Sequence, residues 1–181
     1  MFWTGPPLSL YELLSLQSFI AAGARVSVYS TSKTLRVPEG VELLDARELW
    51  PGPVRRFFYP DGDPSPALHS DLVRYVMLHR FGGWYADLDM ICLRGLPTSK
   101  VYLGWQTDQS VNGAIMKFPP HSPVMAGANR GIACTAAANR AGRTAHVAHY
   151  AWAAVGDEAR SRLCARSCCA SDIKRVSHRF C

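Results

Sequence analysis

Residues 70–89 read SDLVRYVMLHRFGGWYADLD, and this stretch decides the fold. Apolar residues recur at helical spacing from Ala67 onward, which predicts a helix with one face turned to the core. The helix is expected to end at Gly82 and Gly83, since glycine is the common residue just after a helix C-terminus. Residues 84–86 then read as a strand. Together with the order strand, helix, strand in the first 44 residues, this unit indicates an α/β sheet.

Two aspartates, Asp87 and Asp89, stand at the end of that strand. In extended backbone, residues i and i+2 point to the same side, so both carboxylates are expected to face one ion. Hard oxygen ligands suit Mg²⁺ or Mn²⁺ better than zinc, and ligands of open α/β sheets bind at the carboxyl ends of strands. The alternative is a polar turn after a buried strand. A second D-x-D at 61–63 lies in a loop rich in Pro and Gly, and we interpret it as such a turn.

Asp71 and Arg74 lie three residues apart on the predicted helix and therefore on one face of it. A pair of this kind is commonly a salt bridge at the surface, which contributes little to stability. The pair also belongs to the same helix–strand unit as Asp87 and Asp89, so it is a candidate part of the same site.

The whole stretch resembles the DXD sugar-binding region of a glycosyltransferase family. The shared pattern is S-D-x-x-R-Y-x-x-L, a short spacer and G-G-x-Y-x-D-x-D, and every position of it is present in residues 70–89. Members include the initiating mannosyltransferase of the yeast Golgi, the lactosylceramide α-galactosyltransferases, the large glucosylating toxins and bacterial relatives of capsular-polysaccharide type. The resemblance extends over roughly residues 2–128. It implies a GT-A-like α/β fold that binds a nucleotide-sugar.

The resemblance also implies a reaction and a role for each site residue. A hexose would pass from a UDP- or GDP-sugar to a glycan or lipid-linked saccharide acceptor, with retention of anomeric configuration. Asp87 and Asp89 would hold Mn²⁺ or Mg²⁺ at the donor diphosphate. Asp71 and Arg74 would bind sugar hydroxyls and a nearby phosphate, since a forked guanidinium suits both. Tyr85 would assist donor binding or pack under the sheet. No residue stands out as a covalent nucleophile, which favours a front-face displacement.

Two further residues are candidates for donor contacts. Trp3 lies in the segment FWTG at 2–5, which resembles the first strand of the family, where a Trp stacks on the donor base. The alternative for Trp3 is a half-buried core aromatic. Asn112 lies in VNGAIM at 111–116, which resembles the strand that lines the acceptor side in bacterial relatives. The alternative for Asn112 is a turn-forming residue before glycine.

The remainder of the first 130 residues also has α/β character. Ser9 and Glu12 form an S-x-x-E capping box before a helix that is expected to end at Gly23. Asp45 and Ser122 are expected to cap two shorter helices, the second of them at 124–128. Runs of β-prone residues predict four further strands: 25–30, 41–44, 101–105 and 114–118.

The chain is predicted to divide into a nucleotide-sugar-binding domain at 1–130 and an irregular tail at 131–181. The tail is rich in Ala, Arg and Cys and has weak periodicity, so poor order is expected there. Free thiols are expected in it, with a zinc site and a frame-shifted remnant as alternatives. The tail contains the side chains that a zinc site would use: Cys164, Cys168, Cys169, Cys181 and His178.

A content of 48% hydrophobic and 19% charged residues fits a globular protein with a core. The net charge of +6 suits nucleic acid, an anionic membrane face or a phosphate-bearing small molecule. No zinc-finger, helix-turn-helix or RNP-like signature is present, so nucleic acid is not an expected partner. Without an apolar run long enough to span a bilayer or a signal-peptide layout, a cytoplasmic location is expected, with at most peripheral contact at the inner membrane face. A degenerate or truncated relative that at most binds donor is the alternative to an active enzyme.

Overall fold

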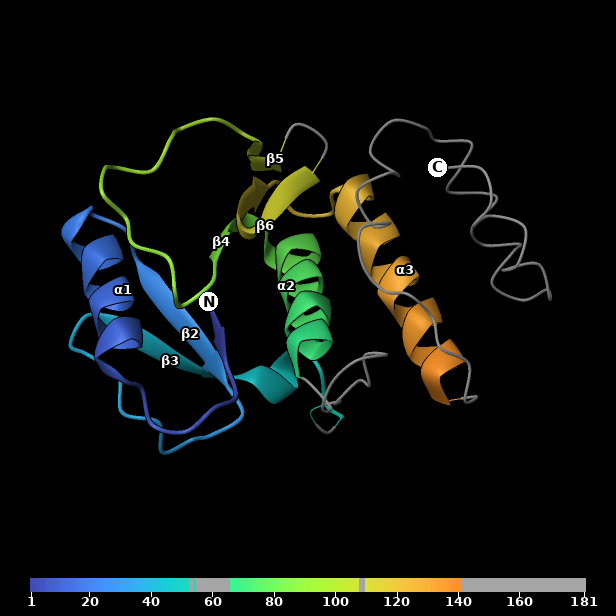
Figure 1. The fold of residues 1–181 in the computed structure, drawn as a ribbon, viewed down its shortest axis with the longest axis horizontal. Helices are drawn as coiled ribbons and strands as arrows, with labels where there is room; N and C mark the ends of the chain where they lie inside the picture. Colours follow the sequence, from blue (N-terminus) through green and yellow to red (C-terminus); the bar gives the residue numbers. More distant parts are fainter. Residues whose placement is uncertain (53, 55–65, 108–109, 141–181) are drawn as a thin grey trace.

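The computed structural model describes residues 1–52, 54, 66–107 and 110–140 (Figure 1). Two three-stranded sheets form the middle of the fold, with helices packed on both of their faces, so the predicted α/β class is confirmed. The second D-x-D at 61–63, the cysteines after residue 140 and His178 lie outside the described residues. Within the described part of the chain, no helix has both the length and the hydropathy to cross a membrane.

The first sheet is parallel, in the order β1-β2-β3. This part of the chain comprises β1 (Phe2–Trp3), α1 (Leu10–Ala21), β2 (Val26–Ser30), β3 (Val41–Asp45) and a 3-10 helix, η1 (Ala46–Glu48). Helix α1 begins at the predicted capping box. The N–H of Tyr11 donates to Ser9 Oγ at 3.2 Å, and the N–H of Ser9 donates to Glu12 Oε2 at 2.6 Å. Asp45 caps η1 as expected.

The second sheet is antiparallel, in the order β4-β6-β5. This part comprises α2 (Ala67–Phe81), β4 (Gly83–Ala86), β5 (Tyr102–Thr107), β6 (Ser110–Phe118) and α3 (Pro123–Arg140). Helix α3 lies along α2 (Figure 1). It continues past the expected helix end at 128 and through the expected boundary at 130, because its Ala-rich sequence favours helix. The division into domains stays a prediction.

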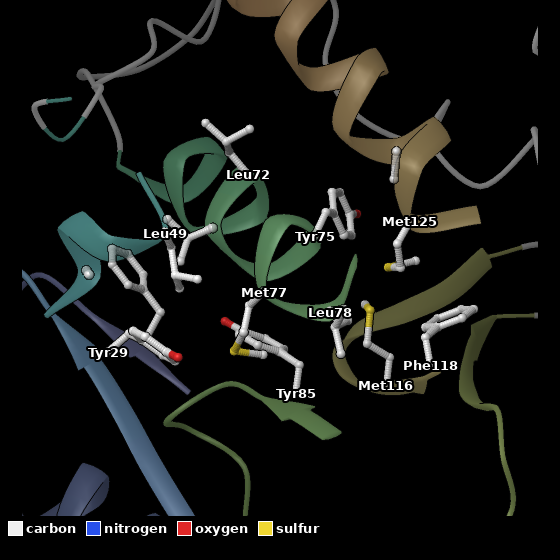
Figure 2. Packing of buried hydrophobic residues seen from close by; sticks show 14 residues of the cluster. Tyr29, Leu49, Leu72, Tyr75, Met77, Leu78, Tyr85, Met116, Phe118 and Met125 are labelled. Carbon is white, nitrogen blue, oxygen red and sulfur yellow. The ribbon is translucent and has the colours of Figure 1, made fainter. Parts of the chain in front are cut away.

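The strands alternate between two apolar clusters, one on each face of the sheets. Tyr29 of β2 and Tyr85 of β4 belong to the cluster around α2, whereas the adjacent Val28 and Ala86 belong to the cluster beneath α1. This alternation follows from the two-residue period of a strand. Figure 2 shows the α2 cluster, in which the helix packs against β4, β6 and α3 through side chains that include Leu78, Tyr85, Met116 and Met125. The buried face of α2 is thereby fixed against the strand that carries the aspartates.

The turn between α2 and β4 requires glycine for two different reasons. Gly82 (φ 66°) and Gly83 (φ 85°) both lie in the left-handed region. A Cβ on Gly82 would also lie 2.5 Å from the backbone nitrogen of Pro120, whereas a Cβ on Gly83 would meet nothing within 4 Å. The N–H of His121 donates to the carbonyl of His79 at 2.7 Å, which ties the Pro120 segment to the end of α2.

Gly82→Ala is therefore expected to lower the free energy of unfolding by about 2 kcal/mol, through left-handed strain together with overlap with backbone. Gly83→Ala adds only the strain and is expected to cost about 1 kcal/mol. Urea denaturation of the two variants and the wild type measures both values. Equal losses in the two variants would contradict the steric explanation for Gly82.

Candidate active site

The two aspartates lie on a turn that follows β4. Strand β4 ends at Ala86, and the N–H of Met90 donates to the carbonyl of Asp87 at 3.3 Å, so residues 87–90 form what we call the aspartate turn. Turning lets Leu88 enter the cluster beneath α1 while Asp89 stays exposed. The prediction that the strand continues to the aspartates is therefore wrong, because β4 ends at Ala86. That both carboxylates face one ion stays a prediction.

The carboxylate of Asp87 is held by two neighbouring side chains. The Tyr85 hydroxyl donates to Asp87 Oδ1 at 2.6 Å, and Arg74 Nη2 donates to Oδ1 at 3.2 Å and to Oδ2 at 3.4 Å. The backbone N–H of Asp87 donates to the carbonyl of Ala114 at 2.8 Å. Asp87 is thus fixed by the folded chain itself. Asp89 is exposed and forms no hydrogen bond or ion pair with the described residues.

Arg74 connects α2 to both neighbouring acids and to β6. Its side chain is only 9% exposed, and Nη2 lies 3.2 Å from Asp71 Oδ1 and 3.2 Å from Asp87 Oδ1. Nη1 donates to the carbonyl of Gly113 at 2.7 Å, and the guanidinium lies 4.6 Å from the centre of the Tyr85 ring. The interpretation of Asp71 and Arg74 as a surface salt bridge is therefore wrong, because the packing of α2 on the sheet buries the pair's cation.

Through these contacts, both terminal nitrogens of the Arg74 guanidinium are bonded to other groups of the protein. Of the three guanidinium nitrogens of Arg74, only Nε is buried without a hydrogen-bond partner in the described part of the chain. The expected contact of Arg74 with a sugar or phosphate stays a prediction, but the geometry favours a different role. Arg74 holds Asp71 and Asp87 next to each other, and Asp71 keeps 34% of its side chain exposed for a ligand.

Burial and charge act in opposite directions on the ionisable groups of this cluster. Burial raises the pKa of Asp87 and of Asp71, and Arg74 opposes the rise at both. Burial also raises the pKa of Tyr85, so its phenol keeps the proton that it donates. Burial disfavours the guanidinium of Arg74, but Tyr85, Asp87 and Asp71 outweigh this effect, and its pKa lies above the ordinary value. Asp71 and Asp87 share the guanidinium of Arg74, the N-terminal ammonium also acts on Asp87, and Asp89 adds a third carboxylate beside Asp87.

The side chain of Tyr85 lies inside the protein and not on the donor side. It is 1% exposed and belongs to the α2 cluster (Figure 2). Its hydroxyl reaches Asp87 at 2.6 Å and lies 3.5 Å from Ser70 Oγ. Of the two roles considered for Tyr85, packing under the sheet fits this position, and its effect on a ligand would pass through Asp87.

Trp3 and Asn112 are both engaged in local contacts. Trp3 is half-buried against the cluster beneath α1, and its Nε1 donates to the carbonyl of Pro6 at 2.7 Å. A Cβ on Gly5 would lie 2.7 Å from the Trp3 ring, so the ring lies against that backbone. Asn112 Oδ1 accepts the N–H of Ala114 at 2.8 Å, and Asn112 lies within β6, so the turn-forming alternative is wrong. Direct donor contacts by Trp3 and Asn112 stay predictions.

Sequence reasoning missed Gly113, which accepts a hydrogen bond from Arg74 although the two lie 39 residues apart. An Asn-Gly pair in a chain indicates only a turn. No local signal states that the carbonyl of this glycine would meet a guanidinium from a helix.

The residues of the aspartate turn fit a hard divalent cation. Asp89 offers an exposed carboxylate, and Asp87 Oδ2 has only the 3.4 Å contact with Arg74. The described residues contain no group of three or more His, Cys, Asp or Glu that could hold a metal. Mg²⁺ and Mn²⁺ commonly bind through one or two carboxylates, with waters and substrate phosphates as the other ligands. Asp89 and Asp87 would hold the ion in that way.

The segment that carries this site matches a known family. A family model described as glycosyltransferase sugar-binding region containing DXD motif matches residues 16–110. This chain belongs to that glycosyltransferase family. The match includes Asp71 and Arg74 on α2 and both acids of the aspartate turn, Asp87 and Asp89.

Two curated proteins are similar to this glycosyltransferase in sequence. Inositol phosphoceramide mannosyltransferase 2 of Schizosaccharomyces pombe is 32% identical over 119 residues, which cover 53% of this chain and 34% of that protein. An uncharacterized protein of Arabidopsis thaliana is 36% identical over 63 residues, which cover 33% of this chain and 10% of that protein. The chain therefore spans about a third or less of the length of these relatives.

A solved structure, the PaToxG glycosyltransferase, resembles this chain in fold. The TM-score is 0.51 at 15% identity, and the superposition covers 78% of this chain and 59% of that chain. The likeness supports the expected GT-A-like fold. The family model, the yeast relative and this structure agree on one class of enzyme, the glycosyltransferases.

Proposed function

We propose that this glycosyltransferase moves a hexose from a UDP- or GDP-sugar to a hydroxyl of a glycan or lipid-linked saccharide, with a divalent metal and with retention. The observation that carries the proposal is one buried guanidinium that holds two carboxylates beside an exposed third. Arg74 lies 3.2 Å from Asp71 and from Asp87, and Asp89 follows on the same turn as Asp87. Such an arrangement suits a ligand that offers both hydroxyls and metal-bound phosphate.

The two aspartates of the turn are assigned unequal tasks. Asp89 is exposed and would be the principal metal ligand, whereas Asp87 is already bonded to Tyr85 and Arg74. A bound Mn²⁺ or Mg²⁺ would supply charge neutralisation at the leaving diphosphate. Asp87 would orient the donor and complete the acidic face of the site.

Asp71 is assigned to the donor sugar. Its carboxylate is partly exposed and faces Arg74, so it can accept hydrogen bonds from sugar hydroxyls without leaving its ion pair. The same ion pairs make Asp71 and Asp87 weaker nucleophiles, since their charge is already shared with a guanidinium. This supports a front-face reaction, in which the acceptor hydroxyl attacks from the side that the diphosphate leaves and a phosphate oxygen takes its proton.

The S. pombe relative, by its name, is a mannosyltransferase for inositol phosphoceramide. This supports a lipid-linked acceptor and a mannose donor among the alternatives for this chain. The choice between sugars rests on one or two side chains of a pocket and is made by experiment.

The test is slow donor hydrolysis by the purified full chain. UDP-glucose, UDP-galactose, UDP-N-acetylglucosamine and GDP-mannose are supplied singly, with Mn²⁺ and with EDTA. Release of UDP or GDP from one donor only in the presence of Mn²⁺ is the expected result. Binding of a donor without release would favour the alternative of a degenerate relative. If the folded chain neither binds a donor nor releases UDP or GDP, the proposal is contradicted.

A further inference from the structure

We propose that residues 112–114 of β6 position the acidic site, and that Gly113 does so because it has no side chain. This inference rests on the proposed function. It adds a positioning residue outside the D-x-D and outside α2. The residues of this positioning segment are Asn112, Gly113 and Ala114.

The pairing of β6 is interrupted where the segment lies. Leu103 of β5 pairs with Met116, but the next residue, Gly104, pairs with Asn112. The residues of β6 between these two pairs therefore have no partner on β5, and β6 bulges there. Such bulges locally re-aim backbone and side chains and are frequent beside active sites. The carbonyl of Gly113 lies in this bulge, whereas the carbonyl of Ala114 lies on the side of β4, next to the pair of Ala86 and Ile115.

Each residue of the positioning segment makes one hydrogen bond that bears on the site. The carbonyl of Gly113 accepts from Arg74 Nη1 at 2.7 Å, and the carbonyl of Ala114 accepts from the backbone N–H of Asp87 at 2.8 Å. The side chain of Asn112 accepts the N–H of Ala114 at 2.8 Å and so fixes the bulge itself. The segment therefore fixes the positions of the Arg74 guanidinium and of Asp87, whose carboxylate that guanidinium contacts.

Gly113 is needed for space and not for backbone conformation. It is not among the glycines with positive φ. A Cβ at this position would lie 2.6 Å from Arg74 Nη1 and 3.9 Å from Arg74 Cζ. A methyl group there would push the guanidinium away from the carbonyl that it contacts. Since the same guanidinium holds Asp71 and Asp87, both carboxylates would lose their alignment together.

The experiment compares Gly113→Ala with Gly104→Ala. Gly104 lies on the adjacent strand, and a Cβ there meets only Asn112 Cβ, at 4.0 Å, so it is a matched control. In Gly113→Ala the kcat of Mn²⁺-dependent donor release is expected to fall by about 10²-fold, the usual effect of misplacing a catalytic group by an ångström. The KM for donor is expected to rise as well, because Asp71, which is assigned to the donor sugar, loses its alignment. Gly104→Ala keeps both values.

A second readout needs no activity. A guanidinium held at Gly113 and between two carboxylates is expected to rotate slowly and to give separate NMR signals for the Arg74 side-chain nitrogens in the wild type. These signals are expected to merge or shift in Gly113→Ala and to persist in Gly104→Ala. Unchanged Arg74 signals, or unchanged kcat in an active Gly113→Ala, would overturn the inference. Changed signals in a chain without donor turnover would uphold the positioning role and reject the proposed function.

If Gly113→Ala does not fold, the double variant Gly113→Ala with Arg74→Lys tests whether the close approach of Arg74 is the cause. The lysine side chain has no forked group at the position of the clash. Recovery of the fold in the double variant supports the close approach as the reason for glycine. No recovery would mean that Gly113 serves the strand and not Arg74.

Discussion

Asp89→Asn is expected to lower Mn²⁺-dependent donor release by roughly 10³-fold, which corresponds to about 4 kcal/mol of transition-state stabilisation. Asp89 is the exposed acid of the aspartate turn and the proposed principal ligand of the metal. Asparagine keeps the size of the side chain but removes the charge that binds a hard cation. Because Asp89 forms no ion pair with the described residues, the folded chain is expected to keep its stability. Donor release and Mn²⁺ affinity are measured on the same preparation.

Glu39→Gln is the matched control for this variant. Glu39 is an exposed acid in the loop before β3, and its neutralisation raises the net charge of the chain by the same amount as Asp89→Asn. It is expected to leave donor release unchanged. The unequal roles of the two aspartates would be refuted if Asp89→Asn kept the metal dependence while Asp87→Asn lost it.

Arg74→Met is expected to lower the free energy of unfolding by roughly 3–4 kcal/mol, because it leaves two partly buried carboxylates without their cation. Asp71 and Asp87 keep 34% and 28% of their side chains exposed, so the loss lies in the lower part of the range for buried pairs. Methionine retains the apolar stem, which separates the effect of charge from that of packing. Urea denaturation measures the difference.

Arg80→Met provides the comparison on the same helix. Arg80 is exposed, and its Nη1 donates to the carbonyl of Glu48 at 2.9 Å. The cost of losing one such exposed contact is expected to stay below about 1 kcal/mol. Equal losses in the two arginine variants would contradict the role of Arg74 as the cation of the site.

The pH dependence of Arg74→Met follows from the same charges. Burial raises the pKa of Asp87, and Arg74 opposes that rise, so removing Arg74 raises this pKa further. A carboxyl with a raised pKa in the folded state favours the unfolded chain once it ionises. The stability lost in Arg74→Met is therefore expected to shrink as the pH falls and the carboxyls take up protons. Protonation of Asp87 competes with Mn²⁺ binding. Because the pKa of Asp87 is higher in the variant, the variant is expected to lose Mn²⁺ at a higher pH than the wild type does.

Several elements of the fold could be predicted because their signals are local. The capping box of Ser9 and Glu12 marks the start of α1, and the Gly82-Gly83 pair marks the end of α2. The strands at 26–30 and 41–45 follow from short runs of β-prone residues. The length of α3 could not be read in the same way, because its weak periodicity concealed a helix that Ala-rich sequence sustains to Arg140.

The site was only partly predictable. The spacing of the pattern in residues 70–89 identified Asp71, Arg74 and the two aspartates of the turn, and the family match includes all four. The same spacing placed the aspartates on a strand that in fact ends at Ala86, and it left open whether Asp71 and Arg74 form a salt bridge at the surface. The burial of Arg74 depends on which distant elements pack on α2 and β4, and no local spacing states it.

The sequence by itself therefore determined the class of fold, the family and the acids that a metal would need, because these are written in residues close together in the chain. Only the tertiary structure decided which of the acids is free and which is held. Arg74 and Gly113 lie 39 residues apart, and their 2.7 Å hydrogen bond exists because α2 packs against a bulge in β6. Contacts of this kind form when distant elements pack together in the core, and no local pattern of residues specifies them.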